Sequence, residues 1–237
     1  MTRLLIGLDD TDRPGARIST ARLARMLADV FDKRAAFIGA MAHRLFAGVP
    51  ATTNNRASCI ILDDEAGRLS PDEVLAEAAS FVERHAETGS SPGLIVTRDV
   101  PRKFVDFGRE ASWRKMSRDE ARACLDGVAC RTFGDGTGLI GALAAIGLTE
   151  EGWSGRWFDF GKLRDFDLEM KVGALTRLGM IVVSIEMDAE LPAPEDIVDT
   201  RRWLRPQLIA GQMVLPVRRF GPGMWVIASV KRTERDG

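Results

Sequence analysis

The stretch Arg3-Leu-Leu-Ile-Gly-Leu-Asp-Asp-Thr-Asp12 is the natural starting point for interpreting this chain. Its first six residues form a short apolar run that ends abruptly, which predicts a buried strand over 3–8. Three carboxylates and a hydroxyl follow at once: Asp9, Asp10, Thr11 and Asp12. Carboxylates this close repel one another unless a cation or a positively charged partner neutralises them. Two interpretations stay open, a Mg²⁺–nucleotide site at the end of a strand and a solvated acidic turn.

The composition is that of an ordinary globular protein. The chain has 237 residues, 45% hydrophobic and 28% charged, which is enough for one large domain or two small ones. A formal net charge of -1 gives no overall attraction to nucleic acid, although a local basic face stays open. The three cysteines form no CxxC pair, which excludes a zinc finger or ribbon and suits a reducing cytosol. We find no signal-peptide pattern and no apolar segment near the roughly 18 residues of a membrane span, so we expect a cytoplasmic protein.

The first 98 residues alternate between strand and helix patterns. Apolar runs over 35–45, 57–62 and 93–97 predict three further strands. Helical spacing of apolar residues predicts an amphipathic helix around 20–31, and Ser70-Pro-Asp-Glu73 predicts a capping box that begins a helix over 71–87. The resulting βαββαβ order is that of a ferredoxin-like unit over residues 1–98.

Ser19 and Thr20 stand where the first of these helices begins. A hydroxyl at this position caps a helix by accepting a bond from a backbone N–H, which is the first interpretation. The same N–H groups attract phosphate, so contact with a phosphate, or acceptance of one, is the second.

Residues 99–237 form the second predicted part, which is α+β in character and either packs as its own lobe or extends the first sheet. Between 100 and 131, basic residues alternate with Phe104, Phe107 and Trp113. This combination favours a nucleotide contact or a solvated helical face. Ser117-Arg-Asp-Glu120 predicts a second capping box and a helix over 118–126. We place the boundary after residue 98 and expect that the two lobes can interleave.

A glycine-dense turn feeds an uncharged, buried helix further along the chain. The turn comprises Gly134, Asp135, Gly136, Thr137 and Gly138, and it predicts an anion cradle made of backbone N–H groups. It lacks the GK[ST] ending of a P-loop. Its GxGxxG spacing, with Asp159 beyond it, keeps open an NAD-binding interpretation, although the strand before it is weak. Close packing of the helix through small residues is the structural alternative.

Two segments taken together resemble the archaeal tRNA(Ile) 2-agmatinylcytidine synthetase family. The first is Gly7-Leu-Asp-Asp-Thr-Asp12, followed by Gly15 and Ser19-Thr20, and the second is Gly138-Leu-Ile-Gly-Ala-Leu-Ala-Ala-Ile-Gly147. Two further features fit in order: Ser91-Pro-Gly93 before a strand, and the strand end at Arg44 before a Pro-Thr-Asn loop. The resemblance covers roughly residues 1–150 and fades beyond them.

The resemblance implies an α+β protein in which a ferredoxin-like βαββαβ unit packs with a second, kinase-like α/β lobe. Such enzymes use ATP to phosphorylate a cytosine carbonyl oxygen, and agmatine then displaces the phosphate. By the resemblance, Asp9, Asp10 and Asp12 hold or face Mg²⁺-ATP. Ser19, with Thr20 as the alternative, stands where the family has a phosphorylatable threonine. Contacts to the nucleotide would then come from Thr11, Thr20 and the Gly134–Gly141 turn. The transferred phosphoryl group would be neutralised by Arg44 and by Arg102 or Lys103.

The chain departs from the family in having no zinc-type cysteine pairs and no added OB-type domain. We therefore expect a truncated family member that activates a carbonyl oxygen of a nucleobase or small molecule for attack by an amine, using ATP and Mg²⁺. A tRNA substrate is less favoured because those tRNA-binding parts are missing, and we expect no membrane partner. The alternatives are a non-catalytic ATP-binding module and an NAD-binding oxidoreductase. Self-association stays open.

Overall fold

Two compact units make up the chain, Met1–Gly161 and Lys162–Gly237. The structure is a computed structural model that describes residues 3–31, 36–49, 55–65, 67–160, 166–187 and 190–228. The expected boundary after residue 98 falls inside the first unit, because the helices that follow it pack onto the first sheet. The Pro-Thr-Asn loop at 50–54 lies outside the described residues.

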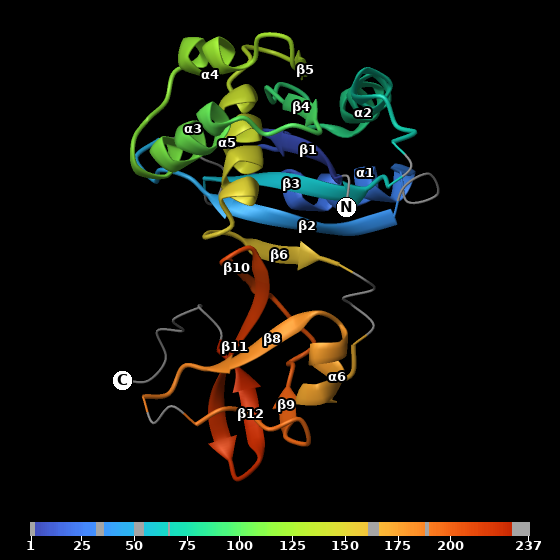
Figure 1. Ribbon diagram of the computed structural model, residues 1–237. Helices are drawn as coiled ribbons and strands as arrows, with labels where there is room; N and C mark the ends of the chain where they lie inside the picture. The colour runs from blue at the N-terminus through green and yellow to red at the C-terminus, as the bar shows by residue number, and fades with distance from the viewer. Residues whose placement is uncertain are drawn as a thin grey trace. The chain divides into compact units, whose positions relative to one another are not determined.

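An antiparallel sheet forms the centre of the first unit (Figure 1). Its strands lie in the order β5-β4-β1-β3-β2-β6, and each pairs antiparallel with its neighbour. In chain order the elements run β1-α1-β2-β3-α2-β4, which is the βαββαβ order expected for residues 1–98. The strand bounds are β1 (Arg3–Asp9), β2 (Ala36–Arg44), β3 (Arg56–Asp63), β4 (Gly93–Thr97), β5 (Ala129–Thr132) and β6 (Arg156–Asp159).

Helices cover both faces of this sheet. The core between the sheet and one set of helices joins Leu4, Ile6 and Leu8 of β1 to α1 (Thr20–Phe31) and α2 (Pro71–His85). On the other face α5 (Gly138–Glu151) crosses in front of β1 and β3, and α3 (Arg102–Trp113) packs against α5 (Figure 1). The short α4 (Arg118–Cys124) also contacts α5. Because β1 is covered on both sides, its apolar run is continuous rather than alternating.

Close approach of α5 to β1 depends on glycines. A Cβ on Gly7 would lie 2.2 Å from the carbonyl oxygen of Ala142, and one on Gly147 would lie 1.9 Å from that of Phe104 in α3. Any side chain at these positions would hold the backbones apart. The glycines therefore serve close helix packing, as the structural interpretation of this segment predicts.

Two of the expected helix starts have different outcomes. At Ser117 the capping box is formed, since its hydroxyl accepts the Glu120 N–H and the Glu120 carboxylate accepts the Ser117 N–H. Ser70 makes no side-chain cap, and α2 begins at Pro71 without the expected box. Proline at the first helical position has no N–H to satisfy and is already set to the helical φ, so α2 starts without that cap.

The second unit is a small mixed sheet with one short helix. Its strands lie in the order β10-β11-β12-β9-β7, with β8 added in parallel to β11. The sequence over 168–178 predicts a helix, and that prediction is wrong at its start, because Met170 of β7 pairs with Val198 and only α6 is helical within this stretch. The bounds are β7 (Glu169–Lys171), α6 (Val172–Arg177), β8 (Met180–Ser184), β9 (Ile197–Asp199), β10 (Gln207–Ile209), β11 (Gln212–Gly221) and β12 (Met224–Ile227). No helix among the described residues of either unit is long and apolar enough to cross a membrane.

Candidate functional site

Asp9 is the last residue of β1, and its carboxylate lies against the first turn of α5. A Cβ added to Gly141 would lie 1.8 Å from Asp9 Oδ2, so this helix position accommodates the carboxylate only as glycine. Burial raises the pKa of Asp9 to about 8, and the charges of Asp10 and Asp12 add to the rise, although a bond from the Asp10 backbone N–H opposes it. Asp9 therefore carries a proton through most of the neutral range unless a cation neutralises this end of the strand.

Asp10 and the glycine-rich turn meet at one hydroxyl, although 127 residues separate them along the chain. The Thr137 Oγ1 lies 3.1 Å from Asp10 Oδ2 and 2.7 Å from Asp135 Oδ1. A hydroxyl has one hydrogen to donate, so it satisfies only one of these carboxylates at a time. Burial raises the pKa of Asp10, with Asp135 and Asp12 adding to the rise, while the Thr137 bond and Arg13 oppose it.

Asp10 also has an unusual backbone, with a φ of 56°. Asp tolerates this left-handed conformation better than most residues, and the conformation turns the chain sharply after β1. The turn directs the Asp10 carboxylate toward Thr137 on the α5 side. We refer to Asp9, Asp10, Asp135 and Thr137 as the acidic cluster.

Asp12 points elsewhere, toward the start of α1. Its Oδ2 accepts the Thr20 N–H at 3.0 Å, while the Ser19 hydroxyl accepts the Arg22 N–H at 3.3 Å. These are N-terminal caps, so the capping interpretation of Ser19 is confirmed. Thr11 and Thr20 are buried together, with their hydroxyl oxygens 3.1 Å apart.

The three carboxylates of the acidic turn thus diverge: Asp9 lies against α5, Asp10 lies beside Thr137, and Asp12 caps α1. Within the residues that the structure describes, no group of three or more His, Cys, Asp or Glu side chains is arranged to hold a metal ion. Asp10 and Asp135 are the two carboxylates that the fold brings together from different segments, and Thr137 supplies a third oxygen between them.

The glycine turn is held tightly against the start of β4. A Cβ on Gly134 would lie 2.5 Å from Ser91 Oγ, and one on Gly138 would lie 2.4 Å from the Gly93 nitrogen. The backbone N–H groups of residues 135–140 all have acceptors within the protein, including the Ser91 carbonyl for Gly138 and an Asp135 carboxylate oxygen for Thr137. The turn therefore presents side-chain oxygens to a ligand more readily than it presents a row of free N–H donors.

The NAD-binding interpretation of the same glycines finds little support in the topology. The strand before the turn, β5, is an edge strand that pairs antiparallel with β4. A dinucleotide-binding unit needs a parallel strand–helix–strand arrangement, with the glycines at the carboxyl end of the first strand.

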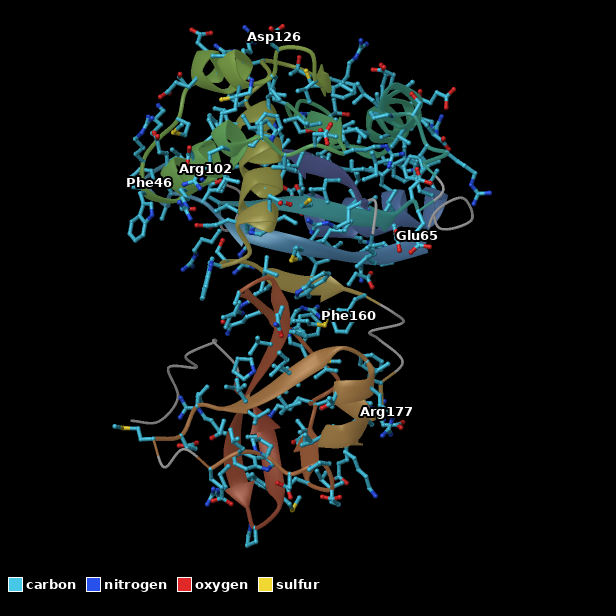
Figure 2. All side chains as sticks on the ribbon, viewed as in Figure 1. Phe46, Glu65, Arg102, Asp126, Phe160 and Arg177 are labelled. Carbon is cyan, nitrogen blue, oxygen red and sulfur yellow. The ribbon has the colours of Figure 1, made fainter. Side chains whose placement is uncertain are left out.

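The remaining predicted residues lie apart from the acidic cluster. Arg44 ends β2 and is exposed. Arg102 begins α3 (Figure 2) and pairs along that helix with Asp106 at 2.9 Å. Lys103 is next to it, and the neighbouring Phe104 contacts α5 at Gly147, about 13 Å along the helix axis from Gly138. Arg102 and Lys103 therefore do not converge with the glycine turn.

His43 is a core residue. It is fully buried, its Nε2 lies 2.8 Å from Thr149 Oγ1, and burial lowers its pKa to about 3. It is therefore neutral at physiological pH and has no access to a substrate. Sequence reasoning did not identify the part played by Ser91, whose carbonyl and hydroxyl both bind the glycine turn, or the steric need for Gly141 beside Asp9. The signals were the motif Ser91-Pro-Gly93 and the repeated glycines, but neither says which segments touch.

Comparisons with known proteins bear on this site. No protein-family model matches the chain. The tRNA(Ile) 2-agmatinylcytidine synthetase TiaS of Thermococcus sibiricus is 26% identical over 152 residues, which are 62% of this chain and 35% of that protein. The chain thus spans about a third of the length of this curated relative.

Solved structures give the same result. A crystal structure of a tRNA fluorescent labelling enzyme has 25% identity and a TM-score of 0.54, covering 61% of this chain and 36% of that one. Apo TiaS has 25% identity and a TM-score of 0.53, covering 61% and 35%. The complex of TiaS with its isoleucine tRNA and ATP aligns with a TM-score of 0.55 at 22% identity, over 75% and 44%, which shows a shared fold. The resemblance to this synthetase family is confirmed, and the mixed α/β fold is shared with its structures.

Proposed function

We propose that the first unit binds ATP with Mg²⁺ at the acidic cluster and transfers the terminal phosphoryl group to an acceptor oxygen. The observation that carries this proposal is the meeting of Asp10 and Asp135 at Thr137 Oγ1, 3.1 and 2.7 Å away. It joins the two sequence segments that carry the family resemblance into one site. The TiaS structures that share the fold include complexes with ATP and with an ATP analogue.

The chemistry of the cluster suits Mg²⁺. All its donors are oxygens, which is what this hard cation prefers, and Mg²⁺ is commonly held by one or two carboxylates together with substrate phosphates. Burial and mutual repulsion raise the pKa values of Asp9 and Asp10, and a bound cation would relieve that repulsion. Asp10 and Asp135 would hold the ion, with Asp9 behind them and Asp12 fixing the start of α1. Mg²⁺ would neutralise charge on the transferring phosphoryl group.

The protein's own groups would position the reaction. Ser19 is exposed at the first turn of α1, where its hydroxyl is available to receive a phosphoryl group in exchange for its cap. Arg44 would neutralise the transferred group. Thr11 and Thr20 would support the turn that carries Asp12. In the full reaction, the phosphoryl group passes from ATP to a carbonyl oxygen, releasing ADP. An amine nitrogen then bonds to that carbon while the C–O bond breaks, phosphate leaves, and the proton lost by the nitrogen passes to the phosphate or to water.

The acceptor we favour is a nucleobase or a small molecule with a comparable carbonyl. The names of the similar proteins refer to a tRNA, and one solved structure contains agmatine. We further propose that the βαββαβ part of the first unit is the ferredoxin-like component and that elements after residue 98 complete the kinase-like component.

A second candidate function is ATP binding without turnover. It is favoured by one specific observation: the N–H groups of residues 135–140 already have acceptors, so the turn offers few donors to stabilise a transition state.

The test is phosphorus NMR of ATP and Mg²⁺ with the purified protein, followed over hours. Release of ADP, lost in Asp10→Asn and Asp135→Asn but kept in the control Asp72→Asn on the exposed start of α2, would support phosphoryl transfer. Broadened but intact ATP signals would favour the binding module. An unperturbed spectrum with all candidate acceptors would contradict both.

A further inference from the structure

Three arginines gather at the same end of the sheet as the acidic cluster, but on the opposite face. Arg44 of β2 and Arg56 of β3 are directly opposite each other, and Arg156 of β6 is opposite Ala42, two residues from Arg44. Cross-strand partners, and residues two apart on one strand, point to one face of a sheet. The three guanidinium groups therefore share a face, which we call the arginine row.

The face is identified by its neighbours. Ala40 and Ala42 precede Arg44 on this side and pack in the core beneath α1 and α2. The alternate residue His43 faces α5 instead, where it meets Thr149. Arg25 of α1 lies 3.7 Å from Asp159 at the end of β6, so α1 packs over β6 on this side of the sheet. The row is therefore on the side where Ser19 begins α1.

The row lies at the same end of the sheet as the acidic cluster, although on the other face. Leu8 of β1 pairs with Ser58 of β3, and Arg56 lies two residues beyond Ser58, at the end of the sheet where β1 finishes with Asp9. Neighbouring strands are about 4.8 Å apart, which sets Arg56 one strand, Arg44 two strands and Arg156 three strands from β1. The whole set spans roughly 15 Å along one end of the sheet.

Nothing in the described part of the chain neutralises this positive charge. None of its carboxylates pairs with Arg44, Arg56 or Arg156. Arg156 is half-buried, and its pKa is lowered by burial first and then by the charges of Arg56 and Arg44. Like charges directly opposite each other destabilise a sheet. Three arginine side chains on one face, with no carboxylate of the described residues paired to them, have the geometry of an anion-binding site.

We propose that the arginine row is a phosphate-binding site, formed by Arg44, Arg56 and Arg156. Guanidinium groups bind phosphate oxygens through paired, charge-assisted hydrogen bonds. The phosphates come either from ATP or from the backbone of an RNA substrate, and both would lie at the same end of the sheet as the acidic cluster. The identity of the physiological ligand rests on the proposed function. Phosphate binding by the arginine row can be measured without any turnover of ATP.

The first test uses inorganic tripolyphosphate without metal, titrated calorimetrically into the wild type and into Arg56→Gln and Arg156→Gln. We expect each variant to bind about tenfold more weakly, the loss of one charge-assisted contact. The matched control is Arg131→Gln, an exposed arginine on β5 of the same sheet, which should bind like the wild type. Equal affinity in all proteins, or an equal loss in the control, would overturn the proposal.

A stability measurement separates binding from a merely structural role. Removing one charge from a repelling set should raise the melting temperature of Arg156→Gln without ligand, while a structural arginine would lower it. If Arg156→Gln fails to fold, the exposed Arg44→Gln repeats both measurements.

The source of the phosphate follows from ATP and a single-stranded RNA oligonucleotide titrated at several salt concentrations. If the arginine variants lose affinity for ATP but not for RNA, the site binds the phosphates of the nucleotide. Loss of RNA affinity, with the log–log salt slope reduced by about 0.7 for each arginine removed, identifies the RNA backbone. Tripolyphosphate binding is also measured in Asp10→Asn, which lacks a carboxylate of the acidic cluster but keeps the arginine row. This measurement distinguishes the proposed function from the proposed phosphate site. Absent ATP turnover with intact tripolyphosphate binding would fail the proposed function alone.

Discussion

The acidic cluster and the arginine row lie at one end of the same sheet, yet they are built in opposite ways. The cluster depends on close packing, since Asp9 fits only beside a glycine of α5 and Asp10 meets the glycine turn through one hydroxyl. The row depends on register alone, because three exposed or half-buried side chains follow from the pairing of β2, β3 and β6. The first concentrates negative charge in a restricted space, whereas the second spreads positive charge over a surface. This end of the sheet therefore offers groups for a cation on one face and for a phosphate on the other.

The largest effect should come from breaking the cluster's charge. Asp10→Asn keeps the shape and the acceptor for Thr137 but removes one carboxylate. We expect ATP turnover to fall by about 100-fold or more, because a cation held by carboxylates is worth several kcal/mol to a phosphoryl transfer. Steady-state ADP release measures this, and Asp72→Asn is the control. Unchanged turnover in Asp10→Asn would remove the cluster from the mechanism.

The second-largest effect should come from disturbing the packing of α5 against Asp9. Gly141→Ala places a Cβ 1.8 Å from Asp9 Oδ2, and we expect a loss of about 1–3 kcal/mol in the free energy of unfolding. Urea denaturation measures it. The control is Gly221→Ala on β11, whose new Cβ would have Met224 Cβ at 4.0 Å as its nearest neighbour. If Gly141→Ala were as stable as that control, the close fit of Asp9 and α5 would be contradicted.

The pH dependence of stability should distinguish Asp9 from the arginine row. The pKa of Asp9 is raised to about 8 in the folded protein, so the folded state holds this proton more tightly than the unfolded chain does. That stabilisation is complete below the ordinary pKa of about 4 and is lost as the pH rises toward 8. Relative to Asp9→Asn, the wild type should lose stability over this window, by at most about 1.4 kcal/mol per pH unit.

Denaturation curves at pH 5, 6, 7 and 8 would measure this difference, and Mg²⁺ should reduce it by favouring the ionised carboxylate. A difference that stays flat with pH would show that Asp9 is ionised throughout. Arg156→Gln leaves the Asp9 carboxyl in place, so the stability of this variant should change with pH in parallel with the wild type.

The smallest expected change is at the start of α1, between the two regions. Ser19→Ala removes the cap on Arg22 and should cost about 1 kcal/mol of unfolding free energy. Ser19→Thr keeps the hydroxyl and should restore the stability. If Ser19 also accepts the phosphoryl group, Ser19→Ala should abolish the transfer of labelled phosphate from ATP to the protein. If Ser19 only caps α1, the substitution should lower stability and leave that transfer unchanged.

Local patterns predicted the elements of the first unit well. The βαββαβ order, the strand at Gly93–Thr97, the capping box at Ser117 and the cap at Ser19 depend on hydrophobic spacing and turn chemistry within a few residues. The helical pattern over 168–178 was wrong at its start, because β7 pairs with β9, a partner that is distant in the sequence. Tertiary pairing overrides local propensity in such short segments.

The sequence by itself determined the composition of the acidic turn, the glycine-rich turn and the family resemblance, because these are contiguous motifs that the chain carries regardless of its partners. Only the tertiary structure decided that Asp9, Asp10 and Asp12 diverge, that Asp10 meets Asp135 at Thr137, and that three arginines from three strands share one face. The physical reason is that side-chain direction follows from backbone dihedrals and strand register. The Asp10–Thr137 contact and the β2–β6 pairing join segments more than 100 residues apart, beyond the reach of any local pattern.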